Sequence, residues 1–220
     1  MINPEYINKL KYVVIDGPIG VGKTTLAKKL AKSFGSDLVL EGPEDNPFLE
    51  RFYQDPKGAA FQTQLFFLFQ RAKQLENIQQ DDMFQPVRVA DYLIEKDKLF
   101  AELTLDAEEY KLYCQVYEHV TLNMPKPDLV VYLQAPVSVL QKRIANRGRH
   151  YEKTINNHYL TQLGESYARF FHDYVDAPLL IVNAEDMDFA TNEQDYQQLL
   201  TQISRPQRGR QYFNPLSSNL

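Results

Sequence analysis

The sequence contains Gly17-Pro18-Ile19-Gly20-Val21-Gly22-Lys23-Thr24, which matches the phosphate-binding loop pattern G-x-x-x-x-G-K-[ST] at every fixed position. Residues 12–16 before it are largely apolar and β-branched, as is typical of a strand buried in a parallel sheet. Residues 26–31 after it place apolar side chains at helical spacing. Strand, loop and helix therefore stand in the order that a phosphate-binding loop requires, and we expect a bound nucleoside triphosphate.

The parts of this loop have separate roles in binding. Its glycines let backbone N–H groups surround an anion without side chains in the way. Lys23 supplies positive charge for the β- and γ-phosphates, and the hydroxyl of Thr24 is a ligand for Mg²⁺. The residues expected to bind the nucleotide are Gly17, Pro18, Ile19, Gly20, Val21, Gly22, Lys23, Thr24 and Thr25.

Length and periodicity indicate one domain. A chain of 220 residues suffices for one well-buried core and is short for two. We assign residues 1–203 to this domain. Residues 204–220 show no periodicity, and we expect them to form a flexible tail.

Composition excludes several kinds of partner. The formal net charge of −5 argues against a nucleic-acid binder, which requires clustered excess Lys and Arg. No apolar run approaches the ~20 residues needed to cross a bilayer. Residues 1–5 lack the basic-then-apolar order of a secretion signal, and the single Cys114 allows no internal disulfide. We therefore expect a cytoplasmic protein that binds neither nucleic acid nor membrane and whose substrate is a small molecule.

Four further apolar segments predict strands, at residues 38–41, 87–91, 128–133 and 179–183. Helical patterns separate them, and this alternation predicts an α/β fold with a five-stranded parallel sheet flanked by helices.

Acids end the first two of these segments, at the edge where a parallel sheet faces its ligand. Asp91 has the position of a metal-associated carboxylate beside the phosphate-binding loop, and equally that of an N-cap for the next helix. For Glu41, a ligand role and a solvated loop acid are both open.

The helix predicted at residues 60–71 is too apolar for a surface element, yet it carries Gln64 and Arg71 two turns apart on one face. Polar groups on such a helix need partners or a ligand. Its aromatic run favours a core role, although a planar ligand also requires apolar walls and a few hydrogen-bonding groups.

A helix is predicted at residues 136–144, and its end carries three arginines and a glycine, namely Arg143, Arg147, Gly148 and Arg149. Such a segment is either an exposed basic helix end or a mobile lid that closes over phosphates. Because the phosphate-binding loop gives these arginines an anion to bind, we favour a lid at about residues 143–153.

Together these segments resemble the deoxynucleoside kinase family, especially its bacterial deoxyadenosine and deoxyguanosine kinase branch. Residues 143–152 resemble the family lid R-x-x-x-R-G-R-x-x-E, and residues 45–53 resemble the bacterial branch. The resemblance covers Tyr12 to about Phe189. It implies a P-loop kinase fold, ATP-dependent phosphorylation of the 5′-hydroxyl of a deoxynucleoside, and a homodimer packed through helices.

The resemblance also implies roles for residues of the acceptor site. Glu41 matches the catalytic base, and Gln64 matches the side chain that hydrogen-bonds the nucleobase. Arg71 with Asp97 matches the charged pair beyond the base. The residues matched to the sugar 3′-hydroxyl are Tyr53 and Glu152.

For the donor side, Asp91 matches an acid near Mg²⁺, so that Thr24 and Asp91 are the expected metal ligands. The arginines of the lid match those that neutralise the transferring phosphoryl group. The catalytic residues implied in this way are Glu41, Lys23, Arg143, Arg147 and Arg149.

The sequence departs from the family at two places. Tyr92 and Leu93 stand where the family has Arg and Ser after the strand acid, and Gly42 separates Glu41 from Pro43. Two alternative functions remain at this point, a nucleoside monophosphate kinase of the thymidylate kinase type and a non-catalytic nucleotide-binding protein. The first requires a further basic site for the phosphate of its acceptor, and the second does not require Glu41, Gln64 and Arg71 to converge.

Overall fold

The computed structural model describes residues 3–80 and 87–215, and within them a six-stranded sheet has the order β2-β3-β1-β4-β5-β6. All neighbouring strands are parallel. The strands are β1 (Tyr12–Asp16), β2 (Asp37–Val39), β3 (Arg88–Ala90), β4 (Leu129–Gln134), β5 (Leu179–Asn183) and β6 (Arg210–Phe213). The predicted α/β fold with a parallel sheet is confirmed, whereas the predicted number of five strands is wrong.

Strand β1 lies in the middle of the sheet, where Val13 is opposite Val89 of β3 on one side and Leu129 of β4 on the other. All five of its residues are buried. Because parallel strands end at one edge of a sheet, the phosphate-binding loop after β1 shares that edge with the residues after β2 and β3.

Strand β2 is less buried than its sequence predicts. Residues 38–41 are predicted as a buried strand, but β2 covers Asp37–Val39 and exposes Asp37 and Leu38. The position of β2 at the edge of the sheet explains the difference, since β2 pairs with β3 on one side and with no described strand on the other. Glu41 consequently lies in the loop beyond the strand.

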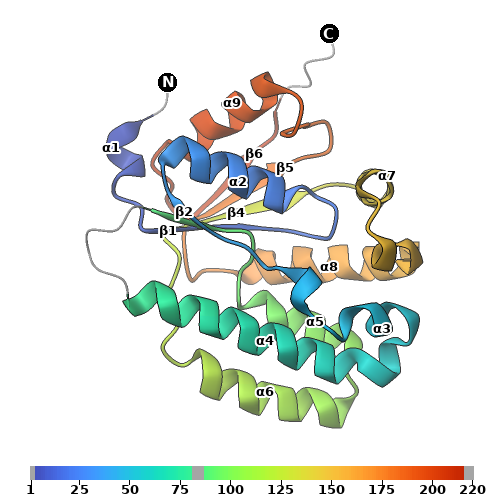
Figure 1. Cartoon of the computed structure of the whole chain (residues 1–220). Helices are drawn as coiled ribbons and strands as arrows, with labels where there is room; N and C mark the ends of the chain where they lie inside the picture. Colours follow the sequence, from blue (N-terminus) through green and yellow to red (C-terminus); the bar gives the residue numbers. More distant parts are fainter. Residues whose placement is uncertain (1–2, 81–86, 216–220) are drawn as a thin grey trace.

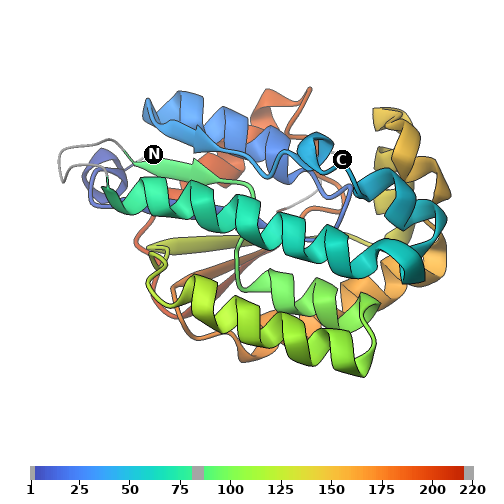
Figure 2. The ribbon, with the colours of Figure 1, turned by 60° about the horizontal axis from the view of Figure 1, so that its bottom comes forward.

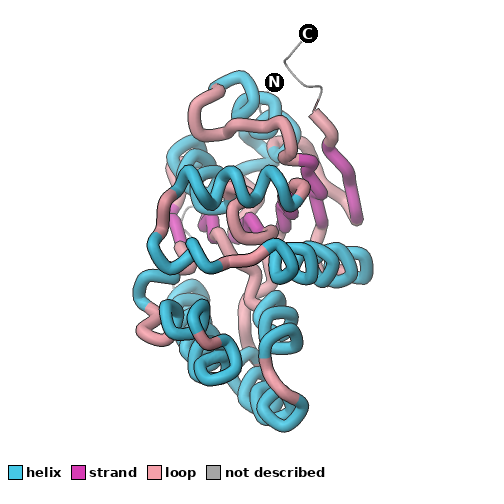
Figure 3. Tube along the Cα trace, turned by 90° about the vertical axis from the view of Figure 1, so that its right-hand side faces the viewer, coloured by secondary structure: helices cyan, strands magenta, loops and turns pink. Residues whose placement is uncertain are grey.

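Helices cover both faces of the sheet, as Figure 1 and Figure 3 show. One face carries α2 (Lys23–Phe34) and α9 (Glu193–Ile203), and the other carries α4 (Pro56–Gln80), α5 (Lys96–Thr104) and α8 (Asn157–Asp173). Helix α6 (Ala107–Thr121) packs outside them against α4 and α5 (Figure 2). The remaining α-helices of the described residues are α1 (Pro4–Ile7), α3 (Leu49–Gln54) and α7 (Val137–Arg147). Within the described residues, no helix is both long and apolar enough to cross a membrane.

Each face of the sheet has its own core. Aliphatic side chains such as Leu26, Leu30 and Leu199 fill the core beneath α2 and α9. Aromatic side chains dominate the opposite core, where the rings of Tyr132 and Phe171 stack with 4.1 Å between centroids. The phosphate-binding loop is thus carried by a strand that is packed on both faces.

Strand β6 lies in the segment for which the sequence predicts a flexible tail. Residues 204–220 are predicted to be a tail, but Arg210–Phe213 pairs with β5 as the sixth strand. Polar contacts fix this segment: Arg210 Nη2 donates to the carbonyl of Phe171 at 3.1 Å, and Gln207 Nε2 donates to that of Gln202 at 2.8 Å. Hydrogen bonds from side chains to carbonyl groups do not require a repeat of apolar residues, so the sequence of this segment shows no hydrophobic periodicity. Residues 216–220 of the predicted tail lie outside the described residues.

Candidate active site

The phosphate-binding loop requires glycine at two positions for reasons of space as well as conformation. Gly17 has φ 147°, and a Cβ on it would lie 2.4 Å from the carbonyl oxygen of Leu133 in β4. Gly20 has φ 85°, and its Cβ would lie 2.8 Å from the carbonyl oxygen of Leu140 in α7. The loop therefore fits between β4 and α7 because these residues lack side chains.

Lys23 begins helix α2 directly after the loop. Its Nζ donates to the carbonyl oxygens of Gly17 at 2.8 Å and Pro18 at 3.3 Å, so the ammonium lies across the mouth of the loop. Burial lowers the pKa of Lys23 to about 8, and the nearby charge of Lys96 acts in the same direction. A bound anion would favour the charged form and offset this cost.

Asp91 connects the phosphate-binding loop with the loop after β2. The hydroxyl of Thr24 donates to Asp91 Oδ2 at 2.5 Å, and the backbone N–H of Glu41 donates to Oδ1 at 2.7 Å. Burial raises the pKa of Asp91, and the charge of Glu41 adds to the rise. The N-cap of α5 is Glu95, so the structure does not place Asp91 at a helix N-cap.

The side chains of Thr24 and Asp91 form a pair that suits Mg²⁺, which prefers hard oxygen ligands and commonly takes few of them from the protein. Among the described residues, no group of three or more His, Cys, Asp or Glu could hold a metal ion. A magnesium ion at this pair would therefore complete its coordination with phosphate oxygens and water.

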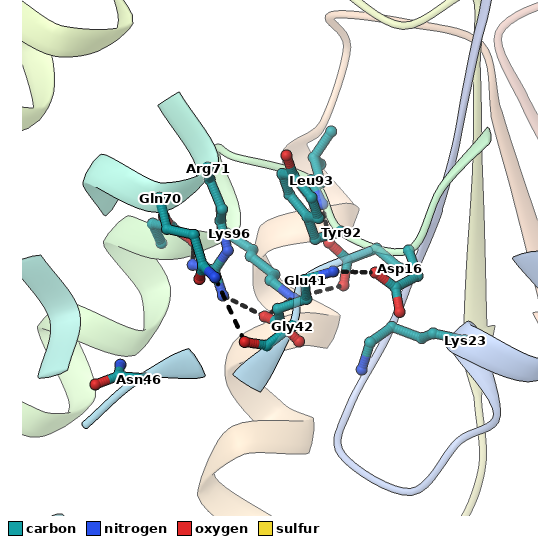
Figure 4. Close-up of polar contacts among 12 residues, drawn as sticks. Asp16, Lys23, Glu41, Gly42, Asn46, Gln70, Arg71, Tyr92, Leu93 and Lys96 are labelled. Atoms are coloured by element: carbon teal, nitrogen blue, oxygen red, sulfur yellow. Dashed lines mark hydrogen bonds and ion pairs between the residues drawn. The ribbon is translucent and has the colours of Figure 1, made fainter. Parts of the chain in front are cut away.

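Glu41 is held by two cations. Arg71 Nη2 and Lys96 Nζ both contact its Oε1, the latter at 3.1 Å. Figure 4 shows both side chains directed toward Glu41 from α4 and α5. Burial alone would raise the pKa of Glu41, but the charges of Lys96 and Arg71 outweigh it and hold the pKa well below its usual range. Glu41 is thus an ionised carboxylate within a charged cluster and not a solvated loop acid.

Arg71 joins Glu41 to Asp97, which it contacts through Nη1. Its guanidinium also lies over the rings of Phe67 at 4.7 Å and Tyr92 at 5.6 Å. The charged pair of Arg71 and Asp97 that the resemblance implies is therefore present, with Asp97 behind the arginine.

One cavity collects most of the predicted site residues. Gln64 lies in its wall, 4% exposed, and donates to the hydroxyl of Thr104 at 3.3 Å. Phe67 and Phe100 supply apolar wall, so part of the aromatic run on α4 faces the cavity. The predicted residues that line it are Ile19, Gly20, Lys23, Thr24, Glu41, Tyr53, Gln64, Arg71, Arg147, Arg149 and Glu152.

The arginine-rich segment lies over this cavity. Helix α7 ends at Arg147, and a short 3-10 helix (His150–Thr154) follows. Arg147 Nε lies 3.1 Å from Glu152 Oε2, and Arg149 Nη2 lies 2.5 Å from Glu44 Oε1. Arg147 and Arg149 thus have carboxylate partners at the wall of the cavity.

Arg143 is separated from the other two lid arginines. Its Nη2 donates to the carbonyl oxygens of Ala184 at 2.8 Å and Met187 at 2.7 Å, and its Nη1 reaches that of Val21 at 3.4 Å. The residue therefore ties α7 to the loop after β5 and to the back of the phosphate-binding loop. It does not line the cavity that Arg147 and Arg149 line.

Two buried charged residues of the site were missed in the sequence. Asp16 ends β1 and accepts from the N–H groups of Gly17 at 2.6 Å and Leu93 at 2.7 Å. Lys96 lines the cavity and lies 3.7 Å from Asp16 Oδ1. Lys96 stands in the charged run of residues 95–98, where it looks like a solvated lysine. The signal that could have found it is Asp16, since an acid at the end of a buried strand needs donors or a cation.

Comparisons with known proteins identify relatives of this chain. The family model described as deoxynucleoside kinase matches residues 13–206. The chain is 38% identical over 205 residues to a deoxyguanosine kinase of Bacillus subtilis, covering 90% of this chain and 98% of that protein. It is 29% identical over 213 residues to a deoxyadenosine kinase of Lactobacillus acidophilus, covering 90% and 97%.

A solved structure shares the fold as well. The deoxyadenosine kinase from M. mycoides with bound dATP superposes with a TM-score of 0.77 and is 27% identical, and the match covers 88% of this chain and all of that chain. Because a family model spans most of the sequence and relatives match along nearly their whole length, the chain belongs to the deoxynucleoside kinase family.

Proposed function

We propose that this deoxynucleoside kinase transfers the γ-phosphate of Mg²⁺-ATP to the 5′-hydroxyl of a purine deoxynucleoside, with Glu41 as the base. The observation that carries the proposal is the shared cavity, which Lys23 of the phosphate-binding loop lines together with Glu41 and Gln64. Phosphoryl transfer requires an anion cradle, a positioned acceptor oxygen and positive charge on the migrating group. The cavity offers residues for each of these.

In this reaction the 5′-hydroxyl of the acceptor faces Glu41. Within the described residues, Arg71 and Lys96 both contact Oε1, and Oε2 is the atom left for the acceptor. The hydroxyl proton passes to Oε2 as the oxygen forms its bond to the γ-phosphorus. The bond from that phosphorus to the bridging oxygen breaks, and ADP leaves.

The acceptor itself is proposed from the opposite end of the cavity. The amide of Gln64 offers a donor and an acceptor to a base edge, and the aromatic walls suit a planar ring. Tyr53 and Glu152 are the proposed partners of the sugar 3′-hydroxyl. A purine is favoured because the relatives in Bacillus subtilis and Lactobacillus acidophilus are named for deoxyguanosine and deoxyadenosine.

On the donor side, we assign Mg²⁺ to the oxygens of Thr24 and Asp91. When bound, the ion neutralises charge on the phosphate oxygens. Arg147 and Arg149 exchange their carboxylate partners for the phosphoryl group as the lid closes. Arg143 differs from the other two proposed catalytic arginines, because its guanidinium contacts the carbonyl of Val21 in the phosphate-binding loop and does not line the cavity.

The alternative of a monophosphate kinase receives no support from the cavity. An acceptor that already carries a phosphate would bring two negative charges against the ionised Glu41. Arg71 and Lys96, the cations on that side, both contact this carboxylate. The family assignment likewise favours an enzyme over a non-catalytic binding protein.

We further propose a cytoplasmic homodimer that assembles through α4 and α6. These helices pack against each other, and each exposes a large apolar side chain, Phe69 at 53% and Leu112 at 49%. Leu112, Val116 and Val120 lie at helical spacing on α6, and Leu112 is exposed while the two valines are half-buried. The cytoplasm is proposed because it supplies ATP, the proposed phosphate donor.

The acceptor class is tested with Mg²⁺-ATP and a panel of deoxynucleosides, ribonucleosides and their 5′-monophosphates. Deoxynucleosides are expected to react, with kcat/KM highest for deoxyguanosine and deoxyadenosine, and products are measured by chromatography. Adding the 5′-monophosphates is the internal control, because they differ from the nucleosides only at the reacting oxygen. Transfer to monophosphates but not to nucleosides would contradict the proposal.

The lid assignment predicts that Arg147→Ala and Arg149→Ala each lower kcat by about 10²-fold while changing the KM for ATP much less. The reason is that their charge matters most when the phosphoryl group is in transfer. Arg169→Ala is the matched control, since Arg169 is exposed on α8 and its guanidinium bonds Ser166. Unchanged kcat in both lid variants would make this segment a basic helix end.

A further inference from the structure

Lys96 has an unusual environment for a lysine. It is the first residue of α5 and 1% exposed, yet its Nζ lies at the wall of the acceptor cavity. The ammonium is 3.1 Å from Glu41 Oε1 and 3.7 Å from Asp16 Oδ1 (Figure 4). A buried charge is retained only where partners offset the loss of hydration. Lys96 therefore needs both acids.

The backbone that carries Lys96 is fixed by Asp16. The N–H of Leu93 donates to Asp16 Oδ2 at 2.7 Å, and this bond turns the chain after β3 back over the end of β1. The N–H of Lys96 then donates to the carbonyl oxygen of Leu93 at 3.2 Å. Asp16 thus helps to position Lys96 and also provides one of the two carboxylates beside its ammonium.

Tyr92 stands where the family pattern has an arginine, but it supplies no charge to the cavity. Its side chain is fully buried, and its hydroxyl donates to Gln74 Oε1 at 2.8 Å. The guanidinium carbon of Arg71 lies 5.6 Å from the centre of the Tyr92 ring. Tyr92 is not among the described residues that line the cavity. Tyr92 therefore packs behind Arg71. The positive charge that the family pattern places at position 92 must come from another residue of this chain.

Arg71 and Lys96 hold Glu41 in different ways. Arg71 also contacts Asp97, on the side of the guanidinium that faces away from Glu41. The guanidinium of Arg71 packs on the rings of Phe67 and Tyr92. Lys96 has its second acid at the base of the phosphate-binding loop, because Asp16 directly precedes Gly17. Lys96 is consequently the contact that links the carboxylate of Glu41 to the loop that binds the phosphates.

We infer that Lys96 is a positioning residue for phosphoryl transfer, which holds Glu41 by Oε1 at a fixed place relative to the phosphate-binding loop and replaces the cation that the family pattern puts at position 92. The inference rests on the proposed function. Asp16 Oδ1 lies 3.7 Å from Lys96 Nζ, so the ammonium has a second acidic partner beside it when Glu41 takes up the acceptor proton.

The test compares Lys96→Met, which keeps the length of the side chain without its charge, with Lys96→Arg, which keeps a charge. Lys96→Met is expected to lower kcat by about 10²-fold, as for a misplaced catalytic group, with much smaller changes in the KM values for ATP and deoxynucleoside. Lys96→Arg is expected to recover much of this loss. Both are measured as initial rates beside thermal unfolding.

Lys98→Met is the matched control on the same helix. The ammonium of Lys98 lies 4.5 Å from the ring centre of Tyr117. Lys98 is not among the described residues that line the cavity. Lys98→Met is therefore expected to keep the wild-type kcat. The folding of Lys96→Met is expected to survive, because Asp16 still accepts from Gly17, Leu93 and the hydroxyl of Tyr167.

Chemical rescue keeps the test decisive if Lys96→Met does not fold. In Lys96→Ala, ethylammonium is expected to restore kcat in a concentration-dependent manner, whereas ethanol of similar size is not. Equal effects of both additives, or a folded Lys96→Met with wild-type kcat, would overturn the role of Lys96 while the proposed function stands. A wild-type protein that phosphorylates no deoxynucleoside would overturn both.

Discussion

Lys23→Ala is expected to lower kcat by at least about 10³-fold, which in most assays abolishes turnover. Lys23 follows the glycines of the phosphate-binding loop, at the motif position whose lysine reaches the β- and γ-phosphates. Its Nζ already lies at the mouth of the loop, bound to the carbonyl oxygens of Gly17 and Pro18. Alanine leaves the backbone cradle in place and removes this charge from it.

The fold is expected to survive this substitution. Burial lowers the pKa of Lys23 to about 8, which means that its surroundings disfavour the charged amine in the absence of an anion. Removing such a group costs the folded state little, so thermal unfolding of Lys23→Ala should stay close to that of the wild type.

Lys28→Ala is the matched control, since Lys28 belongs to the same helix and is exposed to solvent. Its kcat should equal that of the wild type when both are measured with saturating Mg²⁺-ATP and deoxyguanosine. Wild-type activity in Lys23→Ala would contradict the assignment of the phosphate-binding loop.

The parts of the fold that the sequence predicts well are those where one physical requirement dominates. A strand buried on both faces must be apolar, which is why β1 and β5 are found at their predicted residues, 12–16 and 179–183. Gly17 and Gly20 are required by positive φ and by the close approach of Leu133 and Leu140, and such a loop has a fixed pattern.

The parts that were missed depend on tertiary contacts. Strand β6 is anchored by Arg210 and Gln207 through carbonyl groups, which no periodicity records. The exposure of Leu38 follows from the place of β2 at the edge of the sheet, and strand order is not encoded in a local pattern. Lys96 is buried only because α5 is turned over Asp16.

Arg143 illustrates the limit of a motif. The pattern R-x-x-x-R-G-R groups it with Arg147 and Arg149, but a motif records spacing and not direction. In the structure Arg143 donates to carbonyl groups of residues 184–187, whereas the other two line the cavity. We therefore expect a smaller role in transfer for Arg143 than for its two neighbours.

Glu41→Gln is expected to lower kcat by about 10² to 10⁴-fold, the contribution typical of proton transfer to a positioned base. The substitution is close to isosteric and keeps an oxygen that can accept from Arg71 and Lys96. It removes the charge and the ability to take the proton of the 5′-hydroxyl. Nucleoside affinity is expected to change much less than kcat.

The surroundings of Glu41 bear on how this result is interpreted. Burial favours the neutral acid, but Lys96 and Arg71 hold the pKa of Glu41 well below its usual range, which makes it a weak base in the free enzyme. A weak base contributes late, once the acceptor oxygen has begun to bond to phosphorus and its proton has become more acidic. The loss of rate should then appear in the chemical step, measured by single-turnover kinetics.

Glu76→Gln serves as the matched control, because Glu76 is exposed on α4, the helix that carries Arg71. Its single-turnover rate should equal that of the wild type, and a deoxynucleoside titration should give equal affinity for both. If Glu41→Gln instead weakens deoxynucleoside affinity and leaves the single-turnover rate at saturating acceptor unchanged, Glu41 binds the acceptor equally in the ground and transition states. In that case the carboxylate positions the 5′-hydroxyl, and the proton leaves through the phosphoryl group or solvent.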